Sequence, residues 1–118
     1  MTILVADDEE GVRKFLVTVL ANAGYEVVEA ANGREAVEAI RSRRVDLLIT
    51  DLVMPEQEGI ETILALRKSS ASLKIVAISG AFEGRYLNAA ASLGADATIL
   101  KPVSPHDLLS TVREVLAP

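Results

Sequence analysis

Short apolar runs alternate with helical patterns along this chain, and no other feature constrains its fold as strongly. Residues 3–6, 47–50, 75–78 and 97–100 are mostly apolar at consecutive positions, which is typical of strands covered on both faces. A fifth segment, residues 26–30, has a shorter apolar run, Val27-Val28, flanked by acids, so we expect it at the edge of a sheet.

Between these runs, apolar residues recur three and four positions apart, as on one face of a helix. The first stripe begins at Val12 and is ended by Gly24. The last begins at Leu108, after Ser104-Pro105, where a hydroxyl cap and a first-turn proline favour a helix start. The shorter stripes between them are Ala36, Val37 and Ile40, then Ile60, Ile63 and Leu64, then Tyr86, Leu87, Ala90 and Leu93.

Five strands alternating with five helices predict an α/β domain whose parallel sheet has helices on both faces. Right-handed crossovers restrict the topology to a few doubly wound arrangements. With 118 residues, half of them hydrophobic, we expect one domain over residues 1–118 with a substantial core.

The composition excludes several classes of function. A net charge of −5 disfavours direct binding to nucleic acid or to anionic membranes. The absence of cysteine excludes disulfides and thiolate metal sites. No apolar run approaches the ~20 residues of a membrane span, and the start of the chain is unlike a signal peptide. We therefore expect a cytoplasmic protein.

Polar side chains follow four of the five predicted strands. They are Asp7, Asp8, Glu9 and Glu10 after the first, Asp51 after the third, Ser79 after the fourth and Lys101 after the fifth. Ligands of doubly wound sheets bind at the carboxyl ends of the strands. The sequence therefore predicts that these groups share one site.

The predicted site combines three carboxylates with one ammonium and one hydroxyl group. Asp7, Asp8 and Asp51 would repel one another unless a cation offsets their charge. A hard cation with oxygen ligands suits them, Mg2+ first and Mn2+ as a substitute. With Lys101 and Ser79, such a site can hold a phosphoryl group, and a carboxylate inside it can act as the nucleophile.

Each of these residues has an ordinary interpretation when taken alone. Asp8 or Glu9 can cap a helix, Lys101 can be a surface lysine, and Ser79-Gly80 can form a turn. Their joint placement at one edge of the sheet favours the site.

With these residues assembled, the sequence resembles the receiver domain of two-component response regulators. The resemblance implies a flavodoxin-like sheet of strand order 2-1-3-4-5 with five helices on its two faces. The segments on which the resemblance rests are residues 3–9, 46–55 with Gly59, 77–80, and 94–96 through Lys101-Pro102.

The resemblance implies a role for each matching residue. Asp51 would accept the phosphoryl group from a histidine kinase, a phosphotransfer protein or a small phosphodonor. Asp8 would be the principal metal-binding acid, with Asp7 beside it, and Val53 would contribute its main-chain carbonyl. Ser79 and Lys101 would contact the phosphoryl oxygens.

The resemblance also implies how the site is read. The Lys101-Pro102 bond would be cis, and Ser79 would move toward the phosphoryl group. The surface formed by the fourth helix, fifth strand and fifth helix would then change for a protein target or for an output domain outside this sequence. This surface contains Arg85, Asn88, Ala89 and Ser92. Thr98 stands where the family usually has an aromatic residue, so the aromatic part of that switch is in question.

The expected activity is that of a phosphoacceptor with self-phosphorylation and slow self-dephosphorylation, not of an enzyme. Slow loss is expected because Val53 and Ala81 have no polar side chain to orient water. Three other functions compete: a non-phosphorylated interaction module, a Mg2+-dependent aspartyl-phosphate phosphatase, and flavin binding. The interaction module predicts that the acids or the lysine are missing, but all are present. The phosphatase predicts an acid at position 53, where this chain has Val53. Flavin binding predicts a glycine-rich loop where this chain has Asp7 and Asp8.

Overall fold

The computed structural model describes residues 1–52, 59–69, 72–80 and 94–118. Strands and helices alternate along the chain as far as β4. The elements of the described residues are β1 (Thr2–Ala6), α1 (Glu10–Asn22), β2 (Glu26–Ala30), α2 (Gly33–Ser42), β3 (Leu47–Asp51), α3 (Gly59–Ser69), β4 (Lys74–Ser79), β5 (Ala97–Leu100) and α5 (Pro105–Leu116).

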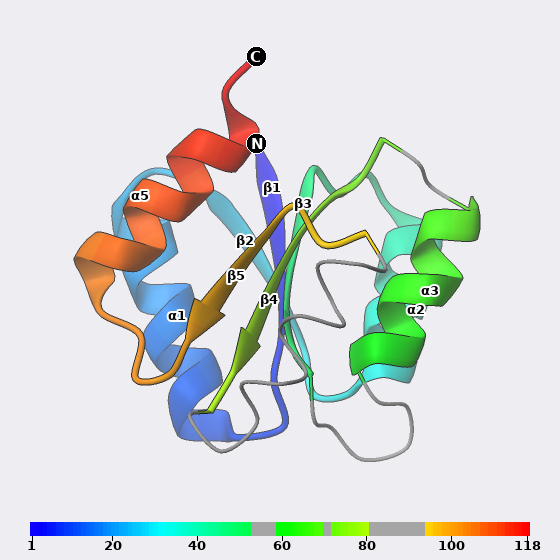
Figure 1. Ribbon diagram of the computed structural model, residues 1–118, viewed down its shortest axis with the longest axis horizontal. Helices are drawn as coiled ribbons and strands as arrows, with labels where there is room; N and C mark the ends of the chain where they lie inside the picture. The colour runs from blue at the N-terminus through cyan, green and yellow to red at the C-terminus, as the bar shows by residue number, and fades with distance from the viewer. Residues whose placement is uncertain (53–58, 70–71, 81–93) are drawn as a thin grey trace.

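The five strands form one parallel sheet in the order β2-β1-β3-β4-β5 (Figure 1). This confirms the predicted flavodoxin-like fold class and strand order. β2 lies at an edge, as expected, and its Glu26 and Glu29 are exposed. β3 lies between two neighbours, and all five of its residues are buried.

Successive strand residues point to opposite faces of the sheet, and each face is covered by helices. Val5 and Ile49 belong to the core cluster on the side of α1 and α5, whereas Leu4 and Leu48 belong to the cluster on the side of α2 and α3. Figure 1 shows the two pairs of helices on opposite sides of the sheet. Coverage on both faces explains why the strands are apolar at consecutive positions.

Four helices are present among the described residues, and the predicted fourth helix of the chain, with Tyr86 to Leu93, lies outside them. Two side chains of the apolar stripes are more exposed than the periodicity predicts: Phe15 of α1 is 40% exposed and Leu64 of α3 is 42% exposed. The residues next to them in the sequence, Leu16 and Ile63, are fully buried. Phe15 and Leu64 therefore lie next to the buried positions of their helices.

Several helix ends match their predicted signals. The Ser104 hydroxyl accepts the main-chain N–H of Asp107 at 3.1 Å, with Pro105 in the first turn of α5. Gly24 follows α1 with a φ of 98°, a conformation that favours glycine. At the start of α1, Glu9 occupies the cap position, but its side chain makes no capping hydrogen bond. The helices of the described part of the chain are too short or too polar to cross a bilayer.

Candidate functional site

The carboxyl ends of the strands bring the predicted polar residues to one rim of the sheet. Asp51 and Ser79 are the last residues of β3 and β4, and Asp7 and Lys101 come directly after β1 and β5. Asp8 lies beside Asp7. The site therefore follows from the topology, since parallel strands all end at the same rim.

Three carboxylates of this rim lie together. One oxygen from each of Asp7, Asp8 and Asp51 can be chosen so that all three lie within 4.8 Å of one another. Asp7 is 1% exposed and Asp51 is 5% exposed, whereas Asp8 is exposed. At this spacing and burial, the negative charges repel one another strongly.

Lys101 provides positive charge to this group of acids. Its Nζ atom lies 3.1 Å from Asp51 Oδ2, 3.4 Å from Asp7 Oδ2 and 3.7 Å from Glu9 Oε1. Burial acts to lower the pKa of Lys101, but the charges of Asp51 and Asp7 outweigh it and hold that pKa above its ordinary value. Lys101 is therefore a fixed cation, but one ammonium group does not balance three carboxylates.

Asp7 is the acid whose environment is least satisfied. Burial and the charge of Asp51 raise its pKa, although the N–H of Glu9, which donates to Asp7 Oδ1 at 2.9 Å, opposes this. Asp7 Oδ2 is buried and accepts no hydrogen bond from the described part of the chain. The Lys101 Nζ atom, 3.4 Å away, is an ion-pair partner of this oxygen, but a divalent cation would coordinate it directly and supply the missing positive charge, so these residues fit Mg2+.

Ser79 places a hydroxyl group on the same rim. It is fully buried at the end of β4, and its main-chain oxygen accepts the N–H of Lys101 at 2.7 Å. This bond holds Ser79, at the end of β4, close to Lys101, which follows the adjacent strand β5. The Lys101-Pro102 bond is cis, as expected.

Several predicted residues fall outside the part of the chain that the structure describes. Val53 lies outside the described residues, as do Ala81 and the predicted partner-facing residues of the fourth helix, Arg85, Asn88, Ala89 and Ser92. Thr98 is exposed on β5, where it pairs with Ala77 of β4.

Arg13 is a residue near the site that the motifs did not indicate. Its Nη1 atom donates to the main-chain oxygen of Asp7 at 2.8 Å, and its Nε atom donates to Glu29 Oε1 at 3.0 Å. The one available signal was a basic residue on the polar side of the first stripe, which is common on any exposed helix.

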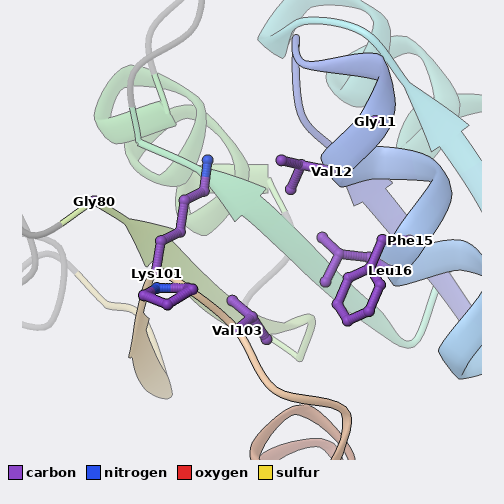
Figure 2. Close-up of a pocket in the computed structure, with 8 residues that line it drawn as sticks. Gly11, Val12, Phe15, Leu16, Gly80, Lys101 and Val103 are labelled. Carbon is purple, nitrogen blue, oxygen red and sulfur yellow. The ribbon is translucent and has the colours of Figure 1, made fainter.

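An apolar hollow of about 490 Å³ lies beside the rim, between α1 and the segment after β5. In Figure 2, Val12, Phe15 and Leu16 of α1 lie on one side of it, and Lys101 and Val103 lie on the other. The exposure of Phe15 is thus explained, since its ring faces this hollow. The hollow offers apolar contact to a partner that approaches Lys101.

Comparison with known proteins adds sequence evidence. The family profile described as "Response regulator receiver domain" matches residues 3–113. The chain is 38% identical over 115 residues to the "Response regulator receiver protein CpdR" of Brucella abortus (strain 2308), covering 97% of this chain and 95% of that protein. It is 37% identical over 114 residues to the "Probable transcriptional regulator ycf27" of Porphyridium aerugineum, covering 97% of this chain and 47% of that protein. The chain thus spans about half the length of the latter.

Solved structures match the fold equally well. A putative response regulator from Chloroflexus aurantiacus J-10-fl has a TM-score of 0.94 at 32% identity, with 99% of this chain and 98% of that chain covered. The receiver domain of NtrX from Brucella abortus has a TM-score of 0.93 at 28% identity, with 97% of each chain covered.

Proposed function

This chain belongs to the response regulator receiver domain family of two-component systems, and on that premise we propose that Asp51 is its phosphoacceptor. The observation that carries the proposal is the environment of Asp51. Its buried carboxylate ends β3, lies 3.1 Å from the Lys101 ammonium, and shares a small space with Asp7 and Asp8.

The donor would be the phosphohistidine of a histidine kinase or phosphotransfer protein, or a small phosphodonor. With phosphohistidine as donor, a carboxylate oxygen of Asp51 bonds to phosphorus while the phosphorus–nitrogen bond of the donor breaks. The electron pair of that bond returns to the imidazole nitrogen, which leaves as the neutral ring after taking a proton from solvent. The apolar hollow next to Lys101 supports docking of a donor protein at this rim.

Receiver domains typically bind Mg2+ at an acidic pocket, and the acids of this chain suit that ion. Asp7, Asp8 and Asp51 would hold it through carboxylate oxygens and Val53 through its main-chain carbonyl, with Mn2+ as a substitute. When bound, the ion offsets the charge of the acids and of the transferring phosphoryl oxygens.

Lys101 and Ser79 would act on the phosphoryl group directly. Lys101 pairs with a phosphoryl oxygen while staying close to Asp51, and the Ser79 hydroxyl donates a hydrogen bond to another. Positioning by these groups accounts for most of the catalysis, since the transfer itself needs little covalent chemistry from the protein. The domain is thus a phosphoacceptor, with self-phosphorylation and self-dephosphorylation as its own reactions.

The signal would be passed on through a change in the surface around β5 and α5. Movement of Ser79 toward the phosphoryl group would pull on β4. β5 would follow, because the N–H of Lys101, the residue after β5, donates to the main-chain oxygen of Ser79. The reader of that surface is a downstream protein or an output domain outside residues 1–118, which we treat as one receiver domain. The acidic, cysteine-free composition agrees with a cytoplasmic setting.

The test is the intact mass of the protein after incubation with Mg2+ and acetyl phosphate. The parent protein should gain one phosphoryl mass, and Asp51→Asn should gain none. Asp107→Asn is the matched control, because Asp107 is an exposed aspartate at the start of α5. Equal labelling of Asp51→Asn and of the parent protein would show that the acceptor is another residue.

A further inference from the structure

Arg13 joins α1 to the end of β1 and to the edge strand β2. We propose that Arg13, anchored on Glu29, is a positioning residue that holds the main chain of Asp7 in the orientation needed for cation binding. This inference rests on the proposed function only in taking Asp7 and Asp8 as metal ligands. Its basis is two hydrogen bonds from one guanidinium group, to Asp7 O at 2.8 Å and to Glu29 Oε1 at 3.0 Å.

The main chain of Asp7 is held on both sides. Its N–H donates to the carbonyl of Ala30 at 3.1 Å and thereby extends the β1–β2 pairing by one residue. Its carbonyl, at the point where the chain leaves the sheet, receives its hydrogen bond from Arg13. The arginine thus replaces the strand neighbour that a carbonyl within the sheet would have.

This carbonyl matters because it shares a planar peptide group with the nitrogen of Asp8. Fixing the carbonyl oxygen therefore fixes the plane from which the Asp8 side chain departs. It also fixes Asp7, whose Oδ1 accepts the N–H of Glu9 and whose buried Oδ2 accepts no hydrogen bond from the residues that the structure describes. Two of the three clustered acids depend on this one contact.

An arginine suits this position better than a lysine. Its planar fork presents several donors at fixed angles, so one side chain reaches two acceptors on different elements. The Arg13 side chain is 14% exposed, and its acceptor Glu29 is also held by Lys14 at 3.1 Å. The hydrogen bond from Lys14, together with that from Arg13, lowers the pKa of Glu29, so the anchor stays ionised.

Charge and positioning predict opposite results when Arg13 is replaced. As a nearby cation, Arg13 repels Mg2+, so its removal would tighten metal binding if charge alone mattered. As a positioning residue, it keeps two ligand acids in place, so its removal weakens metal binding. The sign of the change therefore separates the two roles.

The experiment is calorimetric titration of the whole chain with Mg2+, without any phosphodonor. We expect Arg13→Gln to weaken Mg2+ binding about tenfold, the effect typical of losing a group that orients a metal ligand. Arg13→Lys should bind with intermediate affinity, since one ammonium retains the charge but cannot span both acceptors. Equal or tighter binding by Arg13→Gln overturns the inference.

The matched control is Arg43→Gln. Arg43 pairs with Glu26 at 3.1 Å and so joins a helix end to the same strand β2, but at the end away from the acids. The Mg2+ affinity of Arg43→Gln should stay within a factor of two of that of the parent protein. An equal loss in Arg43→Gln would mean that any β2 ion pair has this effect, and the inference would fail.

Two further measurements keep the inference testable. Amide hydrogen exchange without metal should speed up at Asp7 in Arg13→Gln and stay unchanged at Leu4, and slow exchange at Asp7 would contradict the role. If Arg13→Gln does not fold, Glu29→Leu removes the anchor and leaves Arg13 in place. That variant should bind Mg2+ several-fold more weakly, and unchanged affinity would overturn the role of the anchor.

Failure of this inference differs from failure of the proposed function. Absence of acetyl phosphate labelling in the parent protein would reject Asp51 as the acceptor, while the Mg2+ titrations would still be readable. Unchanged Mg2+ affinity in Arg13→Gln would reject the positioning role alone.

Discussion

The two rims of the sheet use aspartate in opposite ways. At the amino ends of the strands, Asp46 Oδ2 accepts the main-chain N–H of Thr2 at 2.8 Å. Asp96 Oδ2 accepts the N–H of Ile75 at 2.8 Å and pairs with Arg67 at 2.7 Å. Each of these acids accepts a main-chain N–H from another segment and so joins two parts of the backbone.

At the carboxyl ends, three aspartates lie close together, and two of them, Asp7 and Asp51, pair with the ammonium group of Lys101. Asp7 Oδ2 is buried there without a hydrogen bond from the described residues. The difference separates two purposes of a charged side chain. A satisfied carboxylate stabilises the fold, whereas crowded carboxylates destabilise it until a cation offsets their charge.

The largest expected effect tests whether Lys101 belongs to the reacting rim. Lys101→Gln should slow phosphoryl incorporation from acetyl phosphate about a hundredfold, because a fixed positive charge near the transferring group is lost. A time course of intact mass measures this rate. Lys74→Gln is the control, since Lys74 is an exposed lysine that begins β4 at the other rim. Rates within a factor of two for both variants would remove Lys101 from the mechanism.

The next effect tests the structural role of the opposite rim. Asp96→Ala should lower the free energy of unfolding by about 2 kcal/mol, because the buried N–H of Ile75 and the Arg67 guanidinium both lose an acceptor. Urea unfolding measures the change. Phosphoryl incorporation per folded molecule should stay at the parent level. A loss of stability below about 0.5 kcal/mol would contradict the contrast between the rims.

The smallest effect has the opposite sign. Without metal, Asp7→Asn should raise the free energy of unfolding by about 1 kcal/mol, because like-charge repulsion is relieved. This is the usual size of a point-substitution effect, but most substitutions lower the free energy of unfolding. Asparagine keeps an acceptor oxygen for the N–H of Glu9. Added Mg2+ should stabilise this variant much less than the parent protein. Urea unfolding with EDTA and with Mg2+ gives both values, and destabilisation in EDTA would contradict the prediction.

The pH dependence of the free energy of unfolding tests the direction in which the pKa of Asp7 is shifted. Burial raises the pKa of Asp7 in the folded protein above its ordinary value of 3.8, so the folded state holds this proton more tightly than the unfolded state. The Asp7 contribution to stability is therefore fully present below pH 3.8 and is lost as the pH rises through the raised pKa. The free energy of unfolding of Asp7→Asn, measured by urea unfolding across this pH range, should lack this decline.

Most of the fold followed from the alternation of apolar runs and stripes. Consecutive apolar residues such as Leu47, Leu48 and Ile49 require cover on both faces, and helical stripes between the strands provide it. The meeting of Asp7, Asp51 and Lys101 followed as well, because parallel strands end at a common rim.

Other contacts had no signature in the sequence. Arg13 binds the main-chain carbonyl of Asp7, and any residue type presents such a carbonyl. Arg67 reaches Asp96 from a distant part of the chain, and nothing in the local pattern around either residue indicates the pairing. The exposure of Phe15 could not be read from the stripe, since periodicity identifies a face of the helix but not the hollow that one edge of it lines.

The bond between Asp51 and Lys101 joins residues 50 positions apart in the chain, and the lysine belongs to the segment that follows the last strand. If Asp51 is the phosphoacceptor, as proposed, a growing polypeptide has no complete acceptor site until Lys101 has emerged and β5 has joined the sheet. Shortened or incompletely translated copies that lack this segment would then lack the Lys101 charge and would be phosphorylated much more slowly than the whole domain.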